Sequence, residues 1–302
     1  MVLSFIESIF GGIARKTKKE AIRLADEIVE DPHVGRVDAL QGNLQGGLVA
    51  ERKKLPCPMP IPNIGKGSWN VIHKRKKIEA KLSLDEEDSS FKVEFVPGKH
   101  GSISGIGFHA SPTHAFPTLH ARFSYKIYFP EDFDWVRGGK LPGLFIGNPG
   151  ATGGHWDYKA GSARVTWQKD GFACVYLYIP LQVAFDGSKD EAINIQSEEF
   201  RKLCHRTPHK GCHLWHTGPL RFEKGQWNDV TLDLKMNSVG RKNGHLKLTV
   251  NGKSVECHAM VWRKTPHLAI GGVSVQTFYG GSVPEAAAPM NGSFAKFKDF
   301  MV

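Results

Sequence analysis

The sequence predicts an all-β chain, built as an antiparallel β-sandwich or β-jelly roll, with a short helical extension at its N-terminus. From about residue 79 onward, short runs alternate apolar and polar residues, Gly-rich turns separate these runs, and almost no run has helical spacing. Many short strands joined by tight turns are typical of sandwiches and jelly rolls. The 302 residues suffice for one large β domain and an extension.

The N-terminal part of the chain differs from the rest. Apolar residues between positions 4 and 30 recur at helical spacing, and Asp31-Pro32 ends the expected helix because the residue before a proline avoids helical dihedral angles. Prolines at alternate positions in 55–62 then predict a stiff extended linker. We therefore divide the chain into an extension with its linker, 1–62, and a jelly-roll domain, 63–302.

The expected strands of this domain share an alternation of apolar and polar side chains. Between two of them, Asn251-Gly252 is the strongest short signal for a hairpin, and a turn there pairs Leu248 with Val255 on the core side. The expected strands are 79–84, 90–96, 121–129, 161–167, 175–180, 231–236, 246–250, 254–257, 273–278 and 294–300.

The net charge of the chain indicates which kinds of partner it binds, and its cysteines indicate the redox state of its thiols. A formal net charge of +10 and a sequence pI near 9.3 favour a polyanion: nucleic acid, anionic lipid or an acidic polysaccharide. No apolar run is long enough to span a bilayer, and the first ten residues make a poor secretory signal. The five cysteines cannot all pair, so we expect mostly reduced thiols, with Cys204–Cys212 as the favoured bridge.

Two strands in the middle of the domain carry the clearest chemical signal. In 161–167 and 175–180 every second residue is apolar, which predicts two half-buried strands whose other face is exposed to solvent. Ionisable and hydroxyl groups occupy that other face. They are Ser162, Arg164, Tyr176 and Tyr178.

The loop between these strands sets their register. Lys169-Asp170-Gly171 suits a three-residue hairpin loop with glycine in the left-handed conformation. That loop places Arg164 opposite Tyr176 and Ser162 opposite Tyr178, and it keeps apolar residues opposite apolar residues. A two-residue turn would mix the two faces. We therefore expect the four polar side chains to form one contiguous patch, the polar wall.

A wall of cation, phenol and hydroxyl suits β-elimination at a 4-linked uronic acid. A base removes the proton at C5, an acid protonates the departing O4, and cations or amides neutralise the carboxylate beside C5. A tyrosine near cations can act as the base, as the acid, or as both in turn. The chain shows neither a suitable carboxylate pair nor a Gly-x-Ser-x-Gly elbow. The alternative is a polar face that only keeps the sandwich soluble.

Several motifs, in the same order along the chain, resemble polysaccharide lyase family 14, the alginate and glucuronate lyases of algal viruses and molluscs. The resemblance covers about residues 108–302 and is greatest to chlorella-virus members that degrade host cell wall. It implies a β-jelly roll with a cleft on the concave sheet. The run before the Phe-x-x-x-Gly-x-Trp motif, 218–222, departs from the family pattern. The motifs are 138–144, 162–167, 175–180, 222–228 and 278–281.

The resemblance also implies which residues act. Lys140, beside a glycine turn, is essential, either neutralising the substrate carboxylate or serving as the base. Tyr178 transfers a proton at C5 or O4, and Ser162 donates a hydrogen bond. Arg164 and Tyr176 hold the carboxylate and the sugar ring.

Other residues are weaker candidates for substrate contact. His155 lies between the Lys140 turn and the Ser162 strand, where it is either a carboxylate neutraliser or base, or an ordinary surface histidine. Gln276 and Tyr279 are expected to line the far end of the cleft. The cysteines and histidines of 204–216 could ligate zinc, but their spacing fits no standard site, so a pinned or mobile loop is favoured.

The sequence thus predicts a polysaccharide lyase that needs no metal or cofactor and leaves a 4,5-unsaturated uronate end. We expect a monomer that acts outside the cell on a cell wall, with virion association as an open alternative, and without nucleic-acid or membrane partners. The main rival is a non-catalytic jelly roll that binds acidic carbohydrate. A nucleic-acid-binding protein would interleave basic residues with exposed aromatics, whereas most aromatics outside the wall fall on core faces.

Overall fold

A computed structural model of the chain describes residues 52–58, 65–75, 81–151, 160–179, 196–206 and 211–302. All of them belong to one compact unit, Leu48–Val302. The expected N-terminal helix, His155 and the second half of the expected linker lie outside the described residues.

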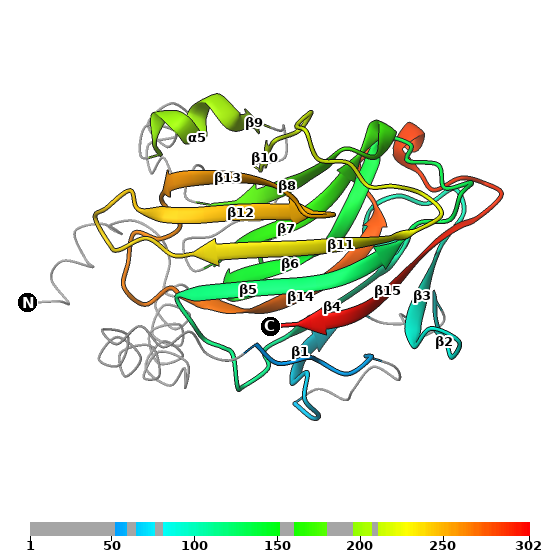
Figure 1. Cartoon of the computed structure of the whole chain (residues 1–302), viewed down its shortest axis with the longest axis horizontal. Helices are drawn as coiled ribbons and strands as arrows, with labels where there is room; N and C mark the ends of the chain where they lie inside the picture. Colours follow the sequence, from blue (N-terminus) through cyan, green and yellow to red (C-terminus); the bar gives the residue numbers. More distant parts are fainter. Residues whose placement is uncertain (1–51, 59–64, 76–80, 152–159, 180–195, 207–210) are drawn as a thin grey trace, which may run out of the picture. The chain divides into compact units, whose positions relative to one another are not determined.

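Two antiparallel sheets form the two layers of the fold (Figure 1), which confirms the predicted jelly roll. In spatial order, the eight-stranded sheet contains β1 (Val71–Lys74), β4 (Ile106–Ala110), β14 (Ile270–Tyr279), β6 (Gly138–Gly147), β7 (Ala160–Gln168), β8 (Ala173–Tyr178), β10 (Cys212–Leu214) and β9 (Cys204–Arg206). The seven-stranded sheet contains β13 (Lys253–Met260), β12 (Gly244–Val250), β11 (Trp227–Lys235), β5 (His120–Tyr128), β15 (Ser293–Met301), β3 (Ser90–Phe95) and β2 (Leu82–Asp85).

Helix is scarce in the described part of the chain, as expected for the jelly-roll domain. The α-helix α5 (Glu198–Leu203) begins at Ser197, whose hydroxyl accepts a hydrogen bond from the amide of Phe200. Short 3₁₀ segments are also described: η2 (Gly101–Ile103), η3 (Lys169–Gly171) and η5 (Pro284–Ala286). Among the described residues, no helix has the length and apolar character needed to cross a bilayer.

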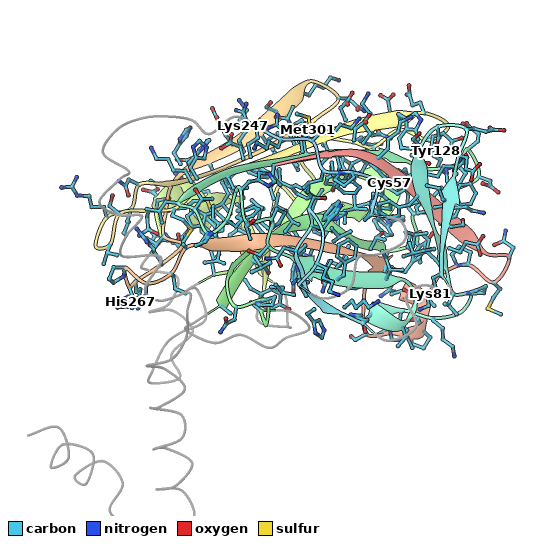
Figure 2. The ribbon with its side chains drawn as sticks, turned by 90° about the horizontal axis from the view of Figure 1, so that it is seen from below. Cys57, Lys81, Tyr128, Lys247, His267 and Met301 are labelled. Carbon is cyan, nitrogen blue, oxygen red and sulfur yellow. The ribbon has the colours of Figure 1, made fainter. Side chains whose placement is uncertain are left out.

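The core fills the space between the two sheets, where Figure 2 shows a dense layer of side chains. Its aromatic centre is Trp167 of β7, whose ring makes edge contacts with Phe129, Phe133 and Tyr279. Strand alternation puts these rings inside, because every second residue of β7 faces the other sheet. The same alternation turns the polar residues of β7 away from the core.

Both predicted hairpin registers are confirmed. Leu248 lies opposite Val255, and the β7–β8 pair places Arg164 opposite Tyr176 and Ser162 opposite Tyr178. The three-residue loop closes as expected. The amide of Gln168 donates to the carbonyl of Phe172 at 2.8 Å, and Gly171 has a φ of 76°.

Strand β6 differs from the glycine turn that the sequence predicts. Its glycines permit close approach within a central strand: a Cβ at Gly139 would lie 2.1 Å from the ring of Trp167. A Cβ at Gly143 would lie 2.2 Å from the carbonyl oxygen of Ala163. A bulge between Lys140 and Gly143 shifts the register with β7.

Two further features are the backbone pairing between the two ends of the domain and the state of its cysteines. The amides of Lys53 and Leu55 donate to the carbonyls of Val302 and Phe300, so the chain at the start of the expected linker pairs with the C-terminal end of the chain. None of the five cysteines, all of which lie in the described part of the chain, forms a disulfide, and the expected Cys204–Cys212 bridge is wrong. In the register of β9 and β10, Cys204 lies opposite Leu214, so Cys204 and Cys212 do not face each other across the two strands.

Candidate active site

One row of directly opposed residues crosses the whole eight-stranded sheet. Directly opposite residues share a face of a sheet, and Val273 and Val275, which flank the row on β14, lie in the core. The row therefore lies on the face turned away from the seven-stranded sheet, which we call the site face. From β1 to β9 the row is His73, His109, Ser274, Gly143, Arg164, Tyr176, His213 and His205.

Lys140 and the two tyrosines meet on this face. The Nζ atom of Lys140 lies 3.2 Å from the centre of the Tyr176 ring, and the two tyrosine rings pack edge to face at 5.2 Å. Arg164 adds a second cation, with its Cζ atom 5.4 Å from the centre of the Tyr178 ring. Two basic side chains and two phenols therefore form one cluster, as the sequence predicts.

Hydrogen bonds fix Ser162 and Arg164 in this cluster. The hydroxyl of Ser162 donates to the carbonyl of Ala151 at 3.0 Å, and the Nη2 atom of Arg164 donates to the same oxygen at 3.3 Å. The Nη1 atom of Arg164 donates to Oε1 of Gln276 at 2.8 Å. Gln276 therefore joins the cluster, and its amide orients the guanidinium.

The polar wall is buried, not exposed to solvent as expected. Arg164 and Tyr178 are each 2% exposed, Ser162 is 4% exposed and Tyr176 is 6% exposed. Segments from distant parts of the chain lie against it: the Ala151 carbonyl contacts Ser162, and a Cβ at Gly211 would lie 2.4 Å from the Tyr176 hydroxyl. Sequence alternation identifies the outer face of a sheet, but it does not tell whether loops cover that face.

One predicted residue, Tyr279, is not brought to the cluster. Tyr279 does not line the site face: its ring meets Trp167 in the core, and its hydroxyl donates to the carbonyl of Asp134 at 2.7 Å. Its separation of three positions from Gln276 puts the two side chains on opposite faces of β14. His155 lies outside the described residues.

Burial changes the acid–base state of Lys140. Desolvation first, and the guanidinium of Arg164 second, hold the pKa of the Lys140 amine well below its ordinary value, while Cys174 opposes this shift. A cation packed beside another cation in a desolvated site loses its proton more readily. This shift favours loss of the Lys140 proton, and the neutral amine can accept a proton.

His213 is a neighbour of the cluster that the sequence analysis grouped with the cysteines and histidines of 204–216 and did not assign to the polar wall. Its ring packs against that of Tyr176 at 4.5 Å, and its Nδ1 atom lies 3.2 Å from the Cys174 thiol. Burial, followed by Lys140, lowers the pKa of His213 to about 2, so the ring is neutral. A three-residue strand is too short for its alternation to be detected, and only the pairing of β10 with β8 places His213 beside Tyr176.

The site face contains no metal cluster among the described residues. The group that brings three candidate ligands within 4.8 Å of one another is His245, Glu256 and His258, in β12 and β13 of the other sheet. The histidines of the 204–216 segment are not part of it, and Thr207 to Lys210 lie outside the described part of the chain.

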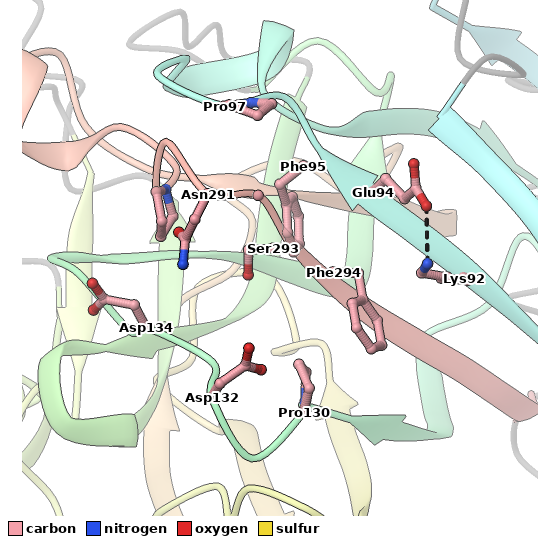
Figure 3. Close-up of a pocket in the computed structure, with 12 residues that line it drawn as sticks. Lys92, Glu94, Phe95, Pro97, Pro130, Asp132, Asp134, Asn291, Ser293 and Phe294 are labelled. Carbon is pink, nitrogen blue, oxygen red and sulfur yellow. Dashed lines mark hydrogen bonds and ion pairs between the residues drawn. The ribbon is translucent and has the colours of Figure 1, made fainter.

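A cavity of about 610 Å³ is lined by residues that do not belong to the row, and Figure 3 shows it. Its lining comes from β3, β15 and nearby loops, and includes Glu94, Asp132 and Asp134. Three carboxylates would repel an anionic polymer. The cavity and the site face are therefore separate features.

The comparison with protein families agrees with this geometry. The family model "Polysaccharide lyase 14" matches residues 79–300. The chain belongs to polysaccharide lyase family 14. This match includes all six residues of the cluster, namely Lys140, Ser162, Arg164, Tyr176, Tyr178 and Gln276, and it confirms the family that the sequence motifs resemble.

Two solved structures and one curated protein are similar to this family-14 chain. The marine alginate lyase of Aplysia kurodai is 25% identical with a TM-score of 0.66, covering 77% of this chain and 90% of its own. The alginate lyase vAL-1 from Chlorella virus is 25% identical with a TM-score of 0.59, covering 78% and 93%. Exolysin of Paramecium bursaria Chlorella virus 1 is 26% identical over 195 residues, which are 59% of this chain and 28% of exolysin. The chain thus spans little more than a quarter of that curated relative.

Proposed function

We propose that this family-14 chain is a lyase that cleaves a 4-linked polyuronate by β-elimination. The observation that carries the proposal is the position of the Lys140 amine, 3.2 Å from the Tyr176 ring and in the same cluster as Arg164 and Tyr178. Two relatives are alginate lyases, so alginate is the first substrate to test. As part of the same proposal, the polymer belongs to a cell wall and is reached outside the cell that makes the chain.

In the proposed reaction, Arg164 and Gln276 bind the carboxylate of the sugar that reacts. The guanidinium and the amide disperse the negative charge that develops when C5 loses its proton. The neutral amine of Lys140 accepts that proton. The electron pair of the C5–H bond forms the C4=C5 double bond, the C4–O4 bond breaks, and the Tyr178 hydroxyl donates a proton to O4. The products are a 4,5-unsaturated uronate and a new reducing end.

The test is incubation with alginate, its mannuronate-rich and guluronate-rich fractions, and glucuronan. Ultraviolet absorbance of the unsaturated uronate and the number of reducing ends should rise together, and Lys140→Ala should abolish both. A glycoside hydrolase would raise reducing ends without absorbance. A non-catalytic binder of acidic carbohydrate would change neither, and either result would overturn the proposal.

A further inference from the structure

Two deeply buried polar groups in the row have no role in the reaction described above. The Nδ1 atom of His109 and the hydroxyl of Ser274 have no hydrogen-bond partner in the described part of the chain. His109 is 6% exposed and Ser274 is 1% exposed, and the two residues lie directly opposite each other on β4 and β14. Buried polar groups are normally paired, because an unpaired one loses its hydration without compensation.

The hydrogen bonds of Gln276 decide which nitrogen of His109 carries the proton. A guanidinium can only donate, so the Gln276 atom that Arg164 meets at 2.8 Å is the carbonyl oxygen. The amide nitrogen of Gln276 therefore faces Nε2 of His109, at 3.3 Å. Since that amide also only donates, Nε2 accepts, and the proton of the neutral ring lies on Nδ1.

The ring stays neutral because its surroundings oppose a positive charge. Burial first, then Arg164, His73 and Arg75, lower the pKa of His109 to about 3. The unpartnered Nδ1 is therefore an N–H donor at any pH at which the enzyme would work. Two groups able to donate, His109 Nδ1–H and the Ser274 hydroxyl, thus lie side by side with nothing on the described chain to accept from them.

The neighbouring residues make this place suitable for an anion. None of the eight residues of the row is acidic. Gly107 leaves room for a further cation, since its Cβ would lie 3.0 Å from Nε of Arg75. Gly143 contributes no side chain between Ser274 and Arg164, whose strands lie two spacings, or about 10 Å, apart. The Arg164 side chain crosses this position to meet Gln276 on β14, so donors and cations lie close together on this part of the site face.

We propose that His109 and Ser274 form a second sugar position, next to the one at Lys140, and donate to the carboxylate of the adjacent uronate residue. This inference rests on the proposed function. Arg164 and Tyr178, which the proposed reaction uses, are at least as deeply buried as His109, so burial does not distinguish His109 from the residues of the reacting position. Two neutral donors close to Arg75 suit a carboxylate better than a neutral sugar hydroxyl, so the position selects an anionic neighbour.

Two substitutions of His109 separate substrate contact from an effect through Gln276. Asparagine places an amide close to the position of Nδ1, whereas glutamine places one close to Nε2. If Nδ1–H contacts substrate, His109→Gln and Ser274→Ala should each raise KM for alginate about tenfold, with kcat within about threefold of wild type. His109→Asn should keep KM within about threefold. His267→Gln, at the exposed histidine labelled in Figure 2, and Ser83→Ala on β2 are the matched controls.

The opposite pattern overturns the proposal. If His109→Gln keeps the wild-type KM and His109→Asn raises it, His109 acts only by orienting Gln276. Unchanged KM in both His109→Gln and Ser274→Ala also overturns it, provided that thermal melting shows folded variants.

A binding measurement separates this proposal from the failure of the proposed function. Calorimetry with a mannuronate tetramer and a neutral cello-oligosaccharide needs no cleavage. Wild type should bind the tetramer about tenfold more tightly than Ser274→Ala does. It should show no binding of the neutral cello-oligosaccharide. If wild type cleaves no polyuronate but shows this difference, only the proposed reaction fails. If it binds both sugars equally or neither, the second sugar position is wrong.

Discussion

The amine of Lys140 reaches the ring of Tyr176 diagonally across β7, with Nζ 3.2 Å from the ring centre. In the register of the sheet, Lys140 lies opposite Thr166, and Thr166 lies opposite Cys174, two residues before Tyr176. A long, unbranched side chain on the bulged strand β6 can make this contact. The position of the amine thus depends on the pairing of three strands, which protects it from solvent and lowers its pKa.

Lys140→Met should change how stability depends on pH. The pKa of Lys140 is lowered in the folded state, so below the unfolded value of 10.5 the unfolded chain binds this proton more readily. Lys140 therefore lowers the free energy of unfolding of wild type at low pH, and this destabilisation decreases as the pH rises towards 10.5. Urea unfolding at several pH values should show Lys140→Met more stable near about pH 7 than wild type, with the difference shrinking by about pH 10. A pH-independent difference would mean that the native lysine stays charged.

Lys140→Arg tests whether Lys140 acts as the base or only as a cation. Arginine keeps the positive charge but stays protonated at any working pH, so it cannot accept the C5 proton. We expect kcat to fall about 10²- to 10⁴-fold, as far as in Lys140→Ala, while polymer binding persists. The wild-type rate should rise with pH through the lowered pKa of Lys140 and then level off. If Lys140→Arg keeps more than about a tenth of the wild-type kcat, Lys140 neutralises charge instead.

Tyr178→Phe and Tyr176→Phe should differ in their effects. We expect Tyr178→Phe to lower kcat about 10²- to 10⁴-fold with little change in KM, because it removes the proton donor to O4. Phenylalanine at 176 keeps the ring against which Lys140 packs, so we expect a loss of about tenfold at most. Steady-state rates on alginate measure both. If Tyr176→Phe lowers kcat more than Tyr178→Phe does, Tyr176 is the proton donor to O4 and Tyr178 is not.

The β7–β8 register was predictable because local information decides it. The alternation of 161–167 and 175–180, together with a three-residue loop, leaves one register in which apolar residues oppose each other. Burial of the wall was not predictable, because Ala151 and Gly211 come from outside both strands.

The members of the row that were missed lack a visible pattern in the sequence. His109 shares its face of β4 with Gly107, which has no side chain, so the strand reads as apolar on both faces. His213 lies on a strand of three residues. Tyr279, by contrast, was assigned to the wrong face, although its odd separation from Gln276 already placed the two apart.

Gly143→Ala tests the close pairing that holds the site strand in place. A Cβ at Gly143 would lie 2.2 Å from the Ala163 carbonyl oxygen and 2.6 Å from the Cα atom of Arg164, both main-chain atoms that move only if β7 moves. We expect a loss of about 2–4 kcal/mol in the free energy of unfolding. We also expect a lower kcat in the remaining folded protein, because β7 carries Ser162 and Arg164.

Gly150→Ala is the matched control for this substitution, since nothing lies within 4 Å of its added Cβ. It should change the free energy of unfolding by no more than about 0.5 kcal/mol. Urea unfolding of both variants, with activity on alginate measured below the transition, makes the comparison. Equal stability of the two variants would show that β6 and β7 pair less closely at this point, and the row would then lose the link between Ser274 and Arg164 on which the second sugar position depends.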